Sequence, residues 1–380
     1  MNVPKLRFKE FNDELSNYKF KDICTFFSGG TPTSSNKDYY NGNIPFIRSG
    51  EIYSDNTELF INQDAINNSS AKLVNKGDLL LALYGATSGN VAISKIDGAI
   101  NQAILCIKPQ YGYSKIFIRY LLENKKETIL KTFLQGGQGN LSAEIIKNLN
   151  YSFPQIEEQE KIGNMLSLLD KKIELQTRKI EDLKLFKLEL KERLFKIFET
   201  KQTELEDIII KWNKKNKDNK YSYVESISNK YGFIAQNEQF EDRNVASNDT
   251  KNYYVIEKGV FAYNPSRLNV GSLALKDNDK VSLVSPLYEC FTTNQNNNFL
   301  YEWFNSKEFK KGTVSKFEGG VRNTLNFNNL CKIKISLPSL ENQNKISNIL
   351  NLYNNLIDLE NQKLNKLIEL KKGLMQNMFV

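Results

Sequence analysis

The chain has 380 residues and a mass of 43.8 kDa, which exceeds one typical domain and allows two, each with its own hydrophobic core. Hydrophobic residues make up 40% and charged residues 25%, which argues against a disordered or membrane-embedded chain. Lys and Arg total 52 against 44 Asp and Glu, and the net charge of +8 favours a polyanionic partner such as nucleic acid.

The sequence contains no histidine, which excludes Ser-His-Asp and Cys-His nucleophile systems, histidine zinc ligands and histidine acid–base catalysis. Four cysteines are scattered without CxxC spacing, so we expect neither a disulfide framework nor a cysteine zinc site. We expect them to be reduced and buried: Cys24, Cys106, Cys290 and Cys331. The predicted inventory therefore has no catalytic residue and no metal ligand.

The N-terminal segment, residues 1–19, lacks the apolar stretch and cleavage site of an export signal. The longest apolar run, residues 79–84, is too short to cross a bilayer. We therefore expect a cytoplasmic protein without a membrane span.

Residues 20–152 form the first predicted globular region. Short apolar segments bounded by Gly, Asn and Pro predict strands at residues 44–47, 79–83 and 103–107, and residues 114–132 have the pattern of a helix. The chain has no GxxxxGK[ST] phosphate loop. The Gly-rich segment Ser28-Gly29-Gly30-Thr31-Pro32 is therefore expected to be a turn and not a nucleotide-binding loop. The region is therefore predicted to be an α+β domain with polar loops.

Residues 153–200 are predicted to form a central spacer helix. Pro154 followed by Glu157 and Glu158 is a helix-start signal. Residues then recur at alternating steps of three and four, which is the pattern of a coiled-coil seam. The stripe is Ile162, Leu166, Leu169, Ile173, Gln176, Ile180, Leu183, Lys187, Leu190, Leu194 and Ile197.

Residues 201–336 form the second predicted globular region, with an expected helix at residues 300–311. Asn264-Pro265-Ser266-Arg267 is a poor match to the Asn-Pro-Pro-Tyr signature of amino-methyltransferases, because it lacks the second Pro and the aromatic that stacks on a flipped base. We interpret it as a Pro turn between strands.

Residues 337–380 are predicted to form a second spacer helix that repeats the first. Residues 153–162 realign with residues 337–346 at a constant shift of 184 positions. The second stripe has polar interruptions at the same places as the first: Ile346, Leu350, Tyr353, Ile357, Glu360, Leu364, Leu367, Lys371, Leu374 and Met378. Weaker similarity continues upstream, where Lys76-Gly77 and Lys258-Gly259 are each followed twelve residues later by a glycine, Gly89 and Gly271.

The duplication predicts two long helices that pack antiparallel about a pseudo-two-fold axis, with the globular domains at opposite ends. A helix of roughly 45 residues spans about 65–70 Å, ample for one turn of DNA. The expected register sets Lys187 against Glu360 and Gln176 against Lys371. The residues of the predicted helix-pair seam are Ile162, Leu169, Ile173, Ile180, Leu183, Lys187, Ile346, Tyr353, Ile357, Glu360, Leu364 and Leu367.

Arginine is scarce in this chain, so its location is informative, because a guanidinium can read guanine bidentately while Asn and Gln pair with adenine. Several such residues lie in Gly- and Asn-rich turns, where they could contact bases or phosphates or serve only as turn residues. The candidate DNA-binding residues are Arg48, Tyr84, Gln135, Gln138, Asn140, Asn264, Arg267, Asn269, Arg322 and Asn323. The Glu-x-Lys triplets beginning at Glu189 and Glu369 are expected to be solvated helix faces, not nuclease carboxylates.

The chain resembles the specificity subunits of type I restriction-modification systems. The resemblance is carried by Phe27–Pro32, Ile44–Arg48, Gly77–Leu80 with Tyr84-Gly85, and Pro154–Ile162 leading to Leu168–Asp170. It implies an α+β fold with two mixed target-recognition domains, residues 20–152 and 201–336, separated by the two helices as an antiparallel coiled coil. The second copy departs from the first, with Asn342 and Asn344 in place of charges and no Ser-Gly-Gly-Thr-Pro loop.

The resemblance further implies that each domain reads one half of a bipartite target in double-stranded DNA. The helices would set the spacing and bind two methyltransferase subunits, and separate motor-nuclease subunits would perform restriction. S-adenosylmethionine, ATP and Mg²⁺ would then be held by the partner subunits, with no cofactor in this chain. Two alternatives stay open from the residues alone: a self-contained DNA methyltransferase, and a coiled-coil adaptor without DNA specificity.

Overall fold

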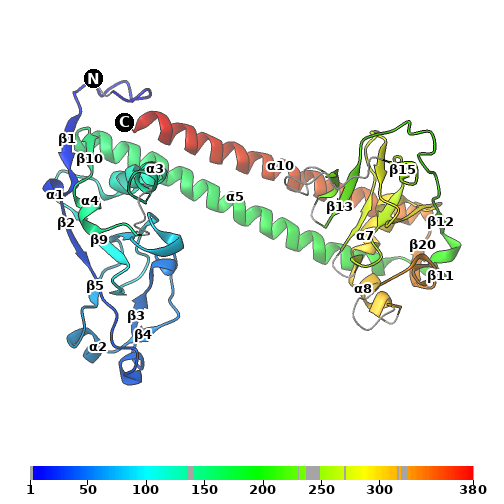
Figure 1. The fold of residues 1–380 in the computed structure, drawn as a ribbon, viewed down its shortest axis with the longest axis horizontal. Helices are drawn as coiled ribbons and strands as arrows, with labels where there is room; N and C mark the ends of the chain where they lie inside the picture. The colour runs from blue at the N-terminus through cyan, green and yellow to red at the C-terminus, as the bar shows by residue number, and fades with distance from the viewer. Residues whose placement is uncertain are drawn as a thin grey trace. The chain divides into compact units, whose positions relative to one another are not determined.

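The computed structural model describes residues 3–134, 140–229, 231–236, 249–268, 271–314, 316–317 and 324–379. The chain divides into two compact units, one of Met1–Lys179 with Glu360–Val380 and the other of Ile180–Leu359. The two long helices, α5 (Ile156–Ile197) and α10 (Leu340–Met378), each contribute one part to each unit (Figure 1). The division between the two units falls within both long helices.

The first unit is built on two sheets packed around apolar strands. One sheet is antiparallel, with the order β2 (Cys24–Ser28), β9 (Ile104–Pro109), β6 (Leu79–Ala82) and β7 (Val91–Ile93). The other has the order β4 (Phe60–Ile61), β3 (Ile44–Ile47), β8 (Gly98–Ile100) and β5 (Lys72–Val74). β6 is buried at every position, which explains its unbroken apolar sequence.

The second unit repeats this topology strand for strand. Its antiparallel sheet has the order β12 (Ile209–Lys211), β19 (Glu289–Thr293), β16 (Phe261–Tyr263) and β17 (Leu273–Leu275). β15 (Tyr254–Ile256) pairs with β18 (Ser282–Val284), and β13 (Glu225–Ser228) pairs with β14 (Gly232–Ala235). The parallel pairing of β3 with β8 reappears as a parallel bridge between Val224 and Leu283. The predicted duplication and α+β class are confirmed.

In each unit an antiparallel strand pair leads into a long helix. The pairs are β1 (Ser16–Lys19) with β10 (Asn150–Phe153), and β11 (Thr200–Glu204) with β20 (Lys334–Pro338). Short helices complete the two units: α1 (Phe20–Ile23), α2 (Gln63–Asn67), α4 (Ala143–Lys147), α9 (Phe327–Cys331), and the 3₁₀ turns η1 (Lys37–Tyr40), η2 (Ser49–Glu51), η3 (Gly85–Thr87) and η4 (Leu205–Asp207).

One predicted helix is two helices. The first unit has a continuous α3 (Lys115–Leu134), but the expected helix at residues 300–311 is split into α7 (Asn297–Phe304) and α8 (Lys307–Val314). The Asn305 amide donates to the carbonyl of Tyr301 (2.9 Å), and the Ser306 hydroxyl accepts from the amide of Phe309 (3.2 Å). Asn305 thus ends one helix and Ser306 caps the next, because short polar side chains compete with the helical backbone for hydrogen bonds.

The repeated Pro-x-x-Glu-x-Gln opening contains a buried clamp. The side chain of Gln159 donates to the carbonyl of Pro154 (2.8 Å) and accepts from the amide of Ser114 (2.9 Å). Gln343 repeats the first bond at Pro338 (2.9 Å) and the second at the amide of Asn296 (3.1 Å). Each Gln therefore ties the start of a long helix to the start of α3 or α7, which explains why Gln occurs in both copies.

The repeated glycines share a backbone conformation. Gly77 and Gly259 have φ of +93° and +89°, and their amides donate to the equivalent carbonyls of Ser94 and Lys276, both at 2.8 Å. This left-handed region disfavours any residue with a Cβ. The spacing noted in the sequence therefore marks the same turn in both units.

The long helices pack antiparallel within each unit, but the predicted register is wrong. In the first unit Gln176 contacts Glu360 and Asp170 contacts Lys371; in the second the Lys187 ammonium donates to Asn354 (2.6 Å). Relative to the expectation, α10 is displaced by about one heptad, which preserves the apolar seam and changes only the polar partners. Lys187 and Lys371 each meet a carboxylate of a domain helix instead of the residue expected on the opposite long helix.

Candidate nucleic-acid interface

In the first unit, two candidate residues from distant segments converge. The amide of Leu83, directly after β6, donates to the carbonyl of Ala103 (2.8 Å), and the carbonyl of Leu83 accepts from the amide of Leu141 (3.0 Å). Tyr84 and Asn140 adjoin these bonded residues, and both side chains are exposed. The turn after β6 thus presents an aromatic ring beside an amide, two groups that suit contact with nucleic acid.

The second unit builds the same arrangement after β16. The carbonyl of Pro265 accepts from the amide of Leu325 (3.0 Å), which places Asn264 and Arg267 beside the segment that precedes α9. Asn264 Oδ1 accepts from the amide of Ser266 (3.0 Å), so the Asn side chain shapes the turn, as expected for a Pro turn between strands. The Arg267 side chain is exposed.

Five candidates lie outside the described residues: Gln135, Gln138, Asn269, Arg322 and Asn323. In the sequence, four of them precede Asn140 or Leu325, and Asn269 comes between the strands β16 and β17.

Arg48 is held by two carboxylates. Its Nε and Nη2 donate to Glu51 (3.1 and 3.0 Å), and Nη2 also contacts Glu58 (2.5 Å). Burial acts to raise the pKa of Glu51, but hydrogen bonds from the Arg48 side chain and from the amides of Glu58 and Arg48 lower it to about 2. The guanidinium is therefore fixed in place, and Arg48 lines a cavity of the first unit.

Polar networks join each domain to the long helices. In the first unit the Lys371 ammonium lies 2.8 Å from both Glu123 on α3 and Asp170 on α5, and Arg119 also reaches Asp170 (2.9 Å). Burial acts to raise the pKa of Asp170, but the hydrogen bonds from Lys371 and Tyr120 lower it overall. The network fixes the rotation of α3 on the helix pair.

The second unit has the equivalent network. Glu302 on α7 contacts Lys187 (2.7 Å) and Lys191 (3.3 Å). Glu302 and Lys191 are buried, so Lys191 is not part of a solvated helix face as expected, although Glu189 and Glu369 are exposed. Glu123, Asp170 and Glu302 were not among the predicted functional residues. Their signal in the sequence was a lysine within each apolar seam, since a lysine buried there requires a carboxylate partner.

Every predicted seam residue is buried or half-buried on α5 or α10: Ile162, Leu169, Ile173, Ile180, Leu183, Lys187, Ile346, Tyr353, Ile357, Glu360, Leu364 and Leu367. In the second unit Tyr353 also packs on Phe186, with ring centroids 5.4 Å apart. Ile197, the last residue of the first stripe, is exposed at the end of α5.

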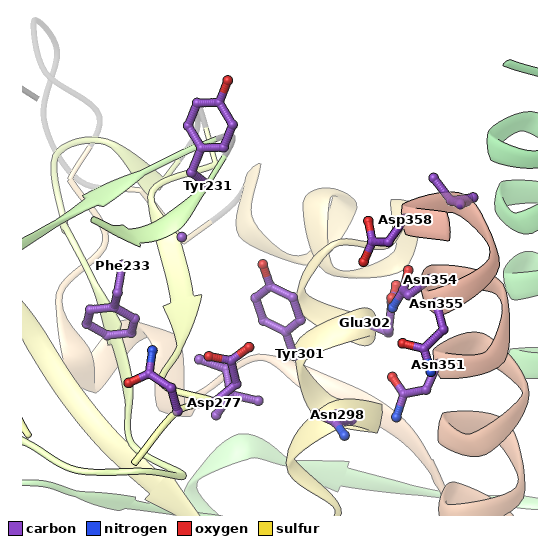
Figure 2. Close-up of a pocket in the computed structure, with 14 residues that line it drawn as sticks. Tyr231, Phe233, Asp277, Asn298, Tyr301, Glu302, Asn351, Asn354, Asn355 and Asp358 are labelled. Carbon is purple, nitrogen blue, oxygen red and sulfur yellow. The ribbon is translucent and has the colours of Figure 1, made fainter. Parts of the chain in front are cut away.

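The second unit also holds a cleft of about 710 Å³ between its domain and α10. Figure 2 shows Tyr301 between the side chains of Phe233 and Asp277 and the amide and carboxylate groups of α10. Asp277, Glu302 and Asp358 line it with several asparagines, so its charge opposes a DNA backbone. Asp277 follows β17 and therefore lies at the strand ends opposite the Arg267 turn. The Arg267 end is the better candidate for DNA.

Side chains that could bind a metal ion or react as nucleophiles are a further feature of the chain. Within the described ranges, no group of three Cys, Asp or Glu side chains is arranged to hold a metal ion. Burial raises the pKa of the Cys24 and Cys106 thiols to about 12, which keeps them protonated. Cys290 is also buried, but Cys331 is only half-buried, contrary to the expectation; all four are free. In the part of the chain that the structure describes, no helix has the length and apolarity needed to span a bilayer.

Two stretches of the chain, residues 12–185 and 194–369, match the family described as "Type I restriction modification DNA specificity domain". The chain belongs to this family. The two matches correspond to the two copies of the repeat, and the family expected from the sequence is confirmed.

Curated members of the specificity family are similar to the chain over slightly less than half or over most of its length. The MjaIX specificity subunit of Methanocaldococcus jannaschii is 32% identical over 48% of this chain and 44% of that protein. The EcoR124I/EcoR124II specificity subunit of Escherichia coli is 23% identical over 45% of this chain and 46% of that protein. These two alignments thus span less than half of each relative. The MjaVIII specificity subunit of M. jannaschii is 24% identical over 93% of this chain and 89% of that protein.

Two solved structures share the fold of this family member. The specificity subunit of the type I system of M. genitalium matches 100% of this chain and 99% of its own, with a TM-score of 0.60 and 17% identity. A chain from a study of complex assembly and conformational transition in the type I system matches 97% of this chain and 98% of its own, with a TM-score of 0.59 and 12% identity.

Proposed function

We propose that this chain is the DNA-specificity subunit of a type I restriction-modification complex and performs no chemistry itself. Each domain reads one half of a bipartite target in double-stranded DNA. Two methyltransferase subunits modify adenines with S-adenosylmethionine, and motor-nuclease subunits with ATP and Mg²⁺ add restriction. The complex acts in the cytoplasm, where its DNA substrate is found.

The observation that carries this proposal is the duplicated polar turn. Tyr84 in the first unit, and Asn264 and Arg267 in the second, follow the equivalent strands β6 and β16. Equivalent bonds from the amides of Leu141 and Leu325 hold these two turns, and the first bond brings Asn140 to the Tyr84 turn. Two similar readers in one chain suit a target made of two half-sites. The net charge of +8 supports phosphate contacts, which give affinity without sequence preference.

The long helices supply the spacing in this proposal. α5 has 42 residues and α10 has 39, and each contributes to both units. At 1.5 Å per residue, α5 is about 63 Å long, enough to span more than one turn of DNA. Inserting matched helical turns into α5 and α10 is expected to lengthen the spacer between the two half-sites.

The proposed docking surfaces for methyltransferase subunits are two exposed apolar patches at equivalent positions. Leu168, Leu175 and Leu370 in the first unit are 69%, 57% and 51% exposed. Their counterparts in the second unit, shifted by 184 positions, are Leu352, Leu359 and Phe186, at 67%, 53% and 50%. Exposed apolar groups at the same places in both repeats favour two copies of one partner.

Stoichiometry tests the docking surfaces. Leu168→Asp with Leu175→Asp is expected to reduce the bound methyltransferase subunits from two to one, as measured by native mass spectrometry. Leu185→Asp is the matched control, because Leu185 is 58% exposed on another face of the same helix. Retention of two subunits by the double variant would place the docking surface elsewhere.

Mapping methylated adenines in DNA exposed to the assembled complex tests the reading function. Exchange of residues 20–152 for another recognition domain is expected to change one half of the mapped site and leave the other unchanged. Co-purification of partner subunits without any sequence preference would instead support the adaptor. Binding of S-adenosylmethionine by the isolated chain would support a self-contained methyltransferase.

A further inference from the structure

A cavity of about 460 Å³ lies beside Arg48 in the first unit. Its walls combine apolar surface, hydroxyl groups, an amide and two basic side chains. The lining residues are Thr31, Ser34, Lys37, Tyr40, Phe46, Arg48, Leu59 and Asn101. A volume of this size suits a small ligand or one residue of a polymer, since ligand pockets typically hold roughly 300–1,000 Å³.

The cavity is formed by rigid elements. Cβ atoms built on Gly29 and Gly30 would lie 1.7 Å from the carbonyl oxygen of Ile100 and 2.5 Å from Ser70 Cβ, so this loop approaches the sheet as closely as only glycine allows. The Tyr40 hydroxyl donates to the carbonyl of Pro32 (2.7 Å), which holds the ring in the wall. The site therefore exists before any ligand arrives, which limits the ordering cost of binding.

One wall of the cavity and the Tyr84 turn are joined through residues 101–103. The Thr31 hydroxyl donates to Gln102 (2.6 Å), and Asn101 lines the cavity in the same turn. The next residue, Ala103, accepts from the amide of Leu83, directly before Tyr84. A DNA strand that contacts Tyr84 therefore passes close to the mouth of the cavity.

We propose, on the basis of the proposed function, that this cavity binds one nucleotide of the DNA target turned out of the base stack. The half-buried Tyr40 and Leu59 offer apolar surface to a base face, and the buried Phe46 lies behind them in the same wall. Lys37, exposed at the mouth, suits the phosphate. Arg48 and Asn101 supply hydrogen-bonding groups for the base edge, which distinguishes the site from a plain apolar groove.

Arg48 is positioned for this role by Glu51. Within the described part of the chain, its Nη2 is shared between Glu51 and Glu58, whereas Nη1 has no hydrogen-bond partner. Glu58 is mostly exposed, so a base that accepts from Arg48 can displace it while Glu51 keeps the guanidinium in place. Guanine, whose major-groove edge presents two acceptors, fits these donors best.

Filling the cavity tests the site without DNA. Saturation-transfer NMR on the full chain with dGMP, dAMP, dCMP and dTMP is expected to show binding, with dGMP strongest. Ser34→Trp, which fills the cavity, should weaken it at least about tenfold. Ser35→Trp is the matched control, because Ser35 is also exposed and does not line the cavity. Equal binding by the Ser34→Trp and Ser35→Trp variants would overturn the proposal.

The second arm uses the assembled complex and its mapped target, with 2-aminopurine placed in turn at each position of the half-site read by residues 20–152. Unstacking raises 2-aminopurine fluorescence, and one position is expected to show a rise that Ser34→Trp removes and Ser35→Trp keeps. A rise that persists in Ser34→Trp belongs to a partner that flips its target base. If Ser34→Trp does not fold, Lys37→Ala against Lys72→Ala, both exposed, replaces the pair.

The outcomes separate this inference from the function on which it rests. Sequence-specific binding without a cavity-dependent rise would overturn the nucleotide site and leave the reading function intact. If the wild-type complex shows no sequence-specific binding, both the nucleotide site and the reading function are overturned. Cavity-dependent binding of free nucleotides with no signal from DNA would assign the site to a free nucleotide and contradict the proposal.

Discussion

Gln176 on α5 donates to the carboxylate of Glu360 on α10 at 2.6 Å, and the two residues occupy the same position in the two copies of the repeat. Lys179 and Lys363, also equivalent to each other, both lie 3.0 Å from the same carboxylate. Equivalent positions of the two repeats thus meet each other directly. They form one asymmetric polar pair, an amide with a carboxylate.

Exchanging this pair tests whether the two positions are interchangeable. Gln176→Glu alone places two carboxylates together and is expected to lower the free energy of unfolding, and Glu360→Gln alone removes the partner of both lysines. The double exchange restores one carboxylate between Lys179 and Lys363, so it should recover at least half of the summed loss. Urea denaturation of the four proteins measures this. Losses that simply add would contradict a symmetric site.

The same carboxylate gives a prediction for acid stability. Hydrogen bonds from Gln176, Lys363 and Lys179 lower the pKa of Glu360 from its ordinary value of 4.5 to about 2. Its stabilising effect is thus complete above about pH 5 and is lost as the pH falls towards 2. The difference in unfolding free energy between wild type and Glu360→Gln should shrink across this window. Glu369→Gln, at an exposed position of α10, should show no such change.

Removing Glu302 is expected to be costly. Its carboxylate lies between Lys187 and Lys191, and Lys191 is buried. Glu302→Leu leaves buried positive charge uncompensated and should destabilise the protein by about 3–5 kcal/mol. Adding Lys191→Met to this variant should recover part of the loss in a thermal or urea melt. No recovery would mean that packing, not charge, dominates here.

The Gln clamp predicts a local effect. Gln159→Leu removes the acceptor for the amide of Ser114 and the donor for the carbonyl of Pro154, both at the start of a helix. Leaving buried groups unpaired should cost about 1–3 kcal/mol. Hydrogen exchange at Ser114 should accelerate while exchange at Asn296, held by Gln343, stays unchanged. Gln343→Leu should give the reverse pattern.

Arg267 gives a prediction for DNA binding. It is exposed at the tip of the turn after β16, where base contact is possible. Arg267→Ala should weaken binding to the mapped target by about 1–3 kcal/mol and binding to unrelated DNA much less. Lys258→Ala, which removes a charge at the opposite end of the same strands, is the control. An equal loss on both DNAs would make Arg267 a phosphate contact.

Elements with a strong local pattern were predictable. The strands at residues 44–47 and 79–82 and the long helices follow from apolar runs, Pro154 and Pro338, because these signals act on the chain nearby. The break in the helix expected at residues 300–311 was not predicted, because the sequence does not show that Asn305 and Ser306 form capping hydrogen bonds. Cap geometry depends on backbone angles that composition does not reveal.

The residues of the candidate site could be predicted from the sequence, but their contacts with one another could not. Tyr84 and Asn140 were identified separately, and only the bonds of Leu83 place them together. Arg48 was predicted as a candidate DNA-binding residue, and its ion pairs with Glu51 and Glu58 could not be predicted. The sequence does not indicate which carboxylate a given arginine meets: Glu51 belongs to η2 and Glu58 to the segment before β4, and only the fold brings both to the guanidinium.

The sequence by itself determined the duplication, the family and the apolar seam of the two helices, because each depends on residue pattern along one chain. Tertiary structure alone decided the register, the carboxylates that meet Lys187 and Lys371, and the cavity beside Arg48. An apolar seam fits a neighbour displaced by one heptad equally well, so hydrophobic burial cannot choose between registers. Short-range polar contacts determine which register is the more stable, and these contacts exist only once the chain has folded.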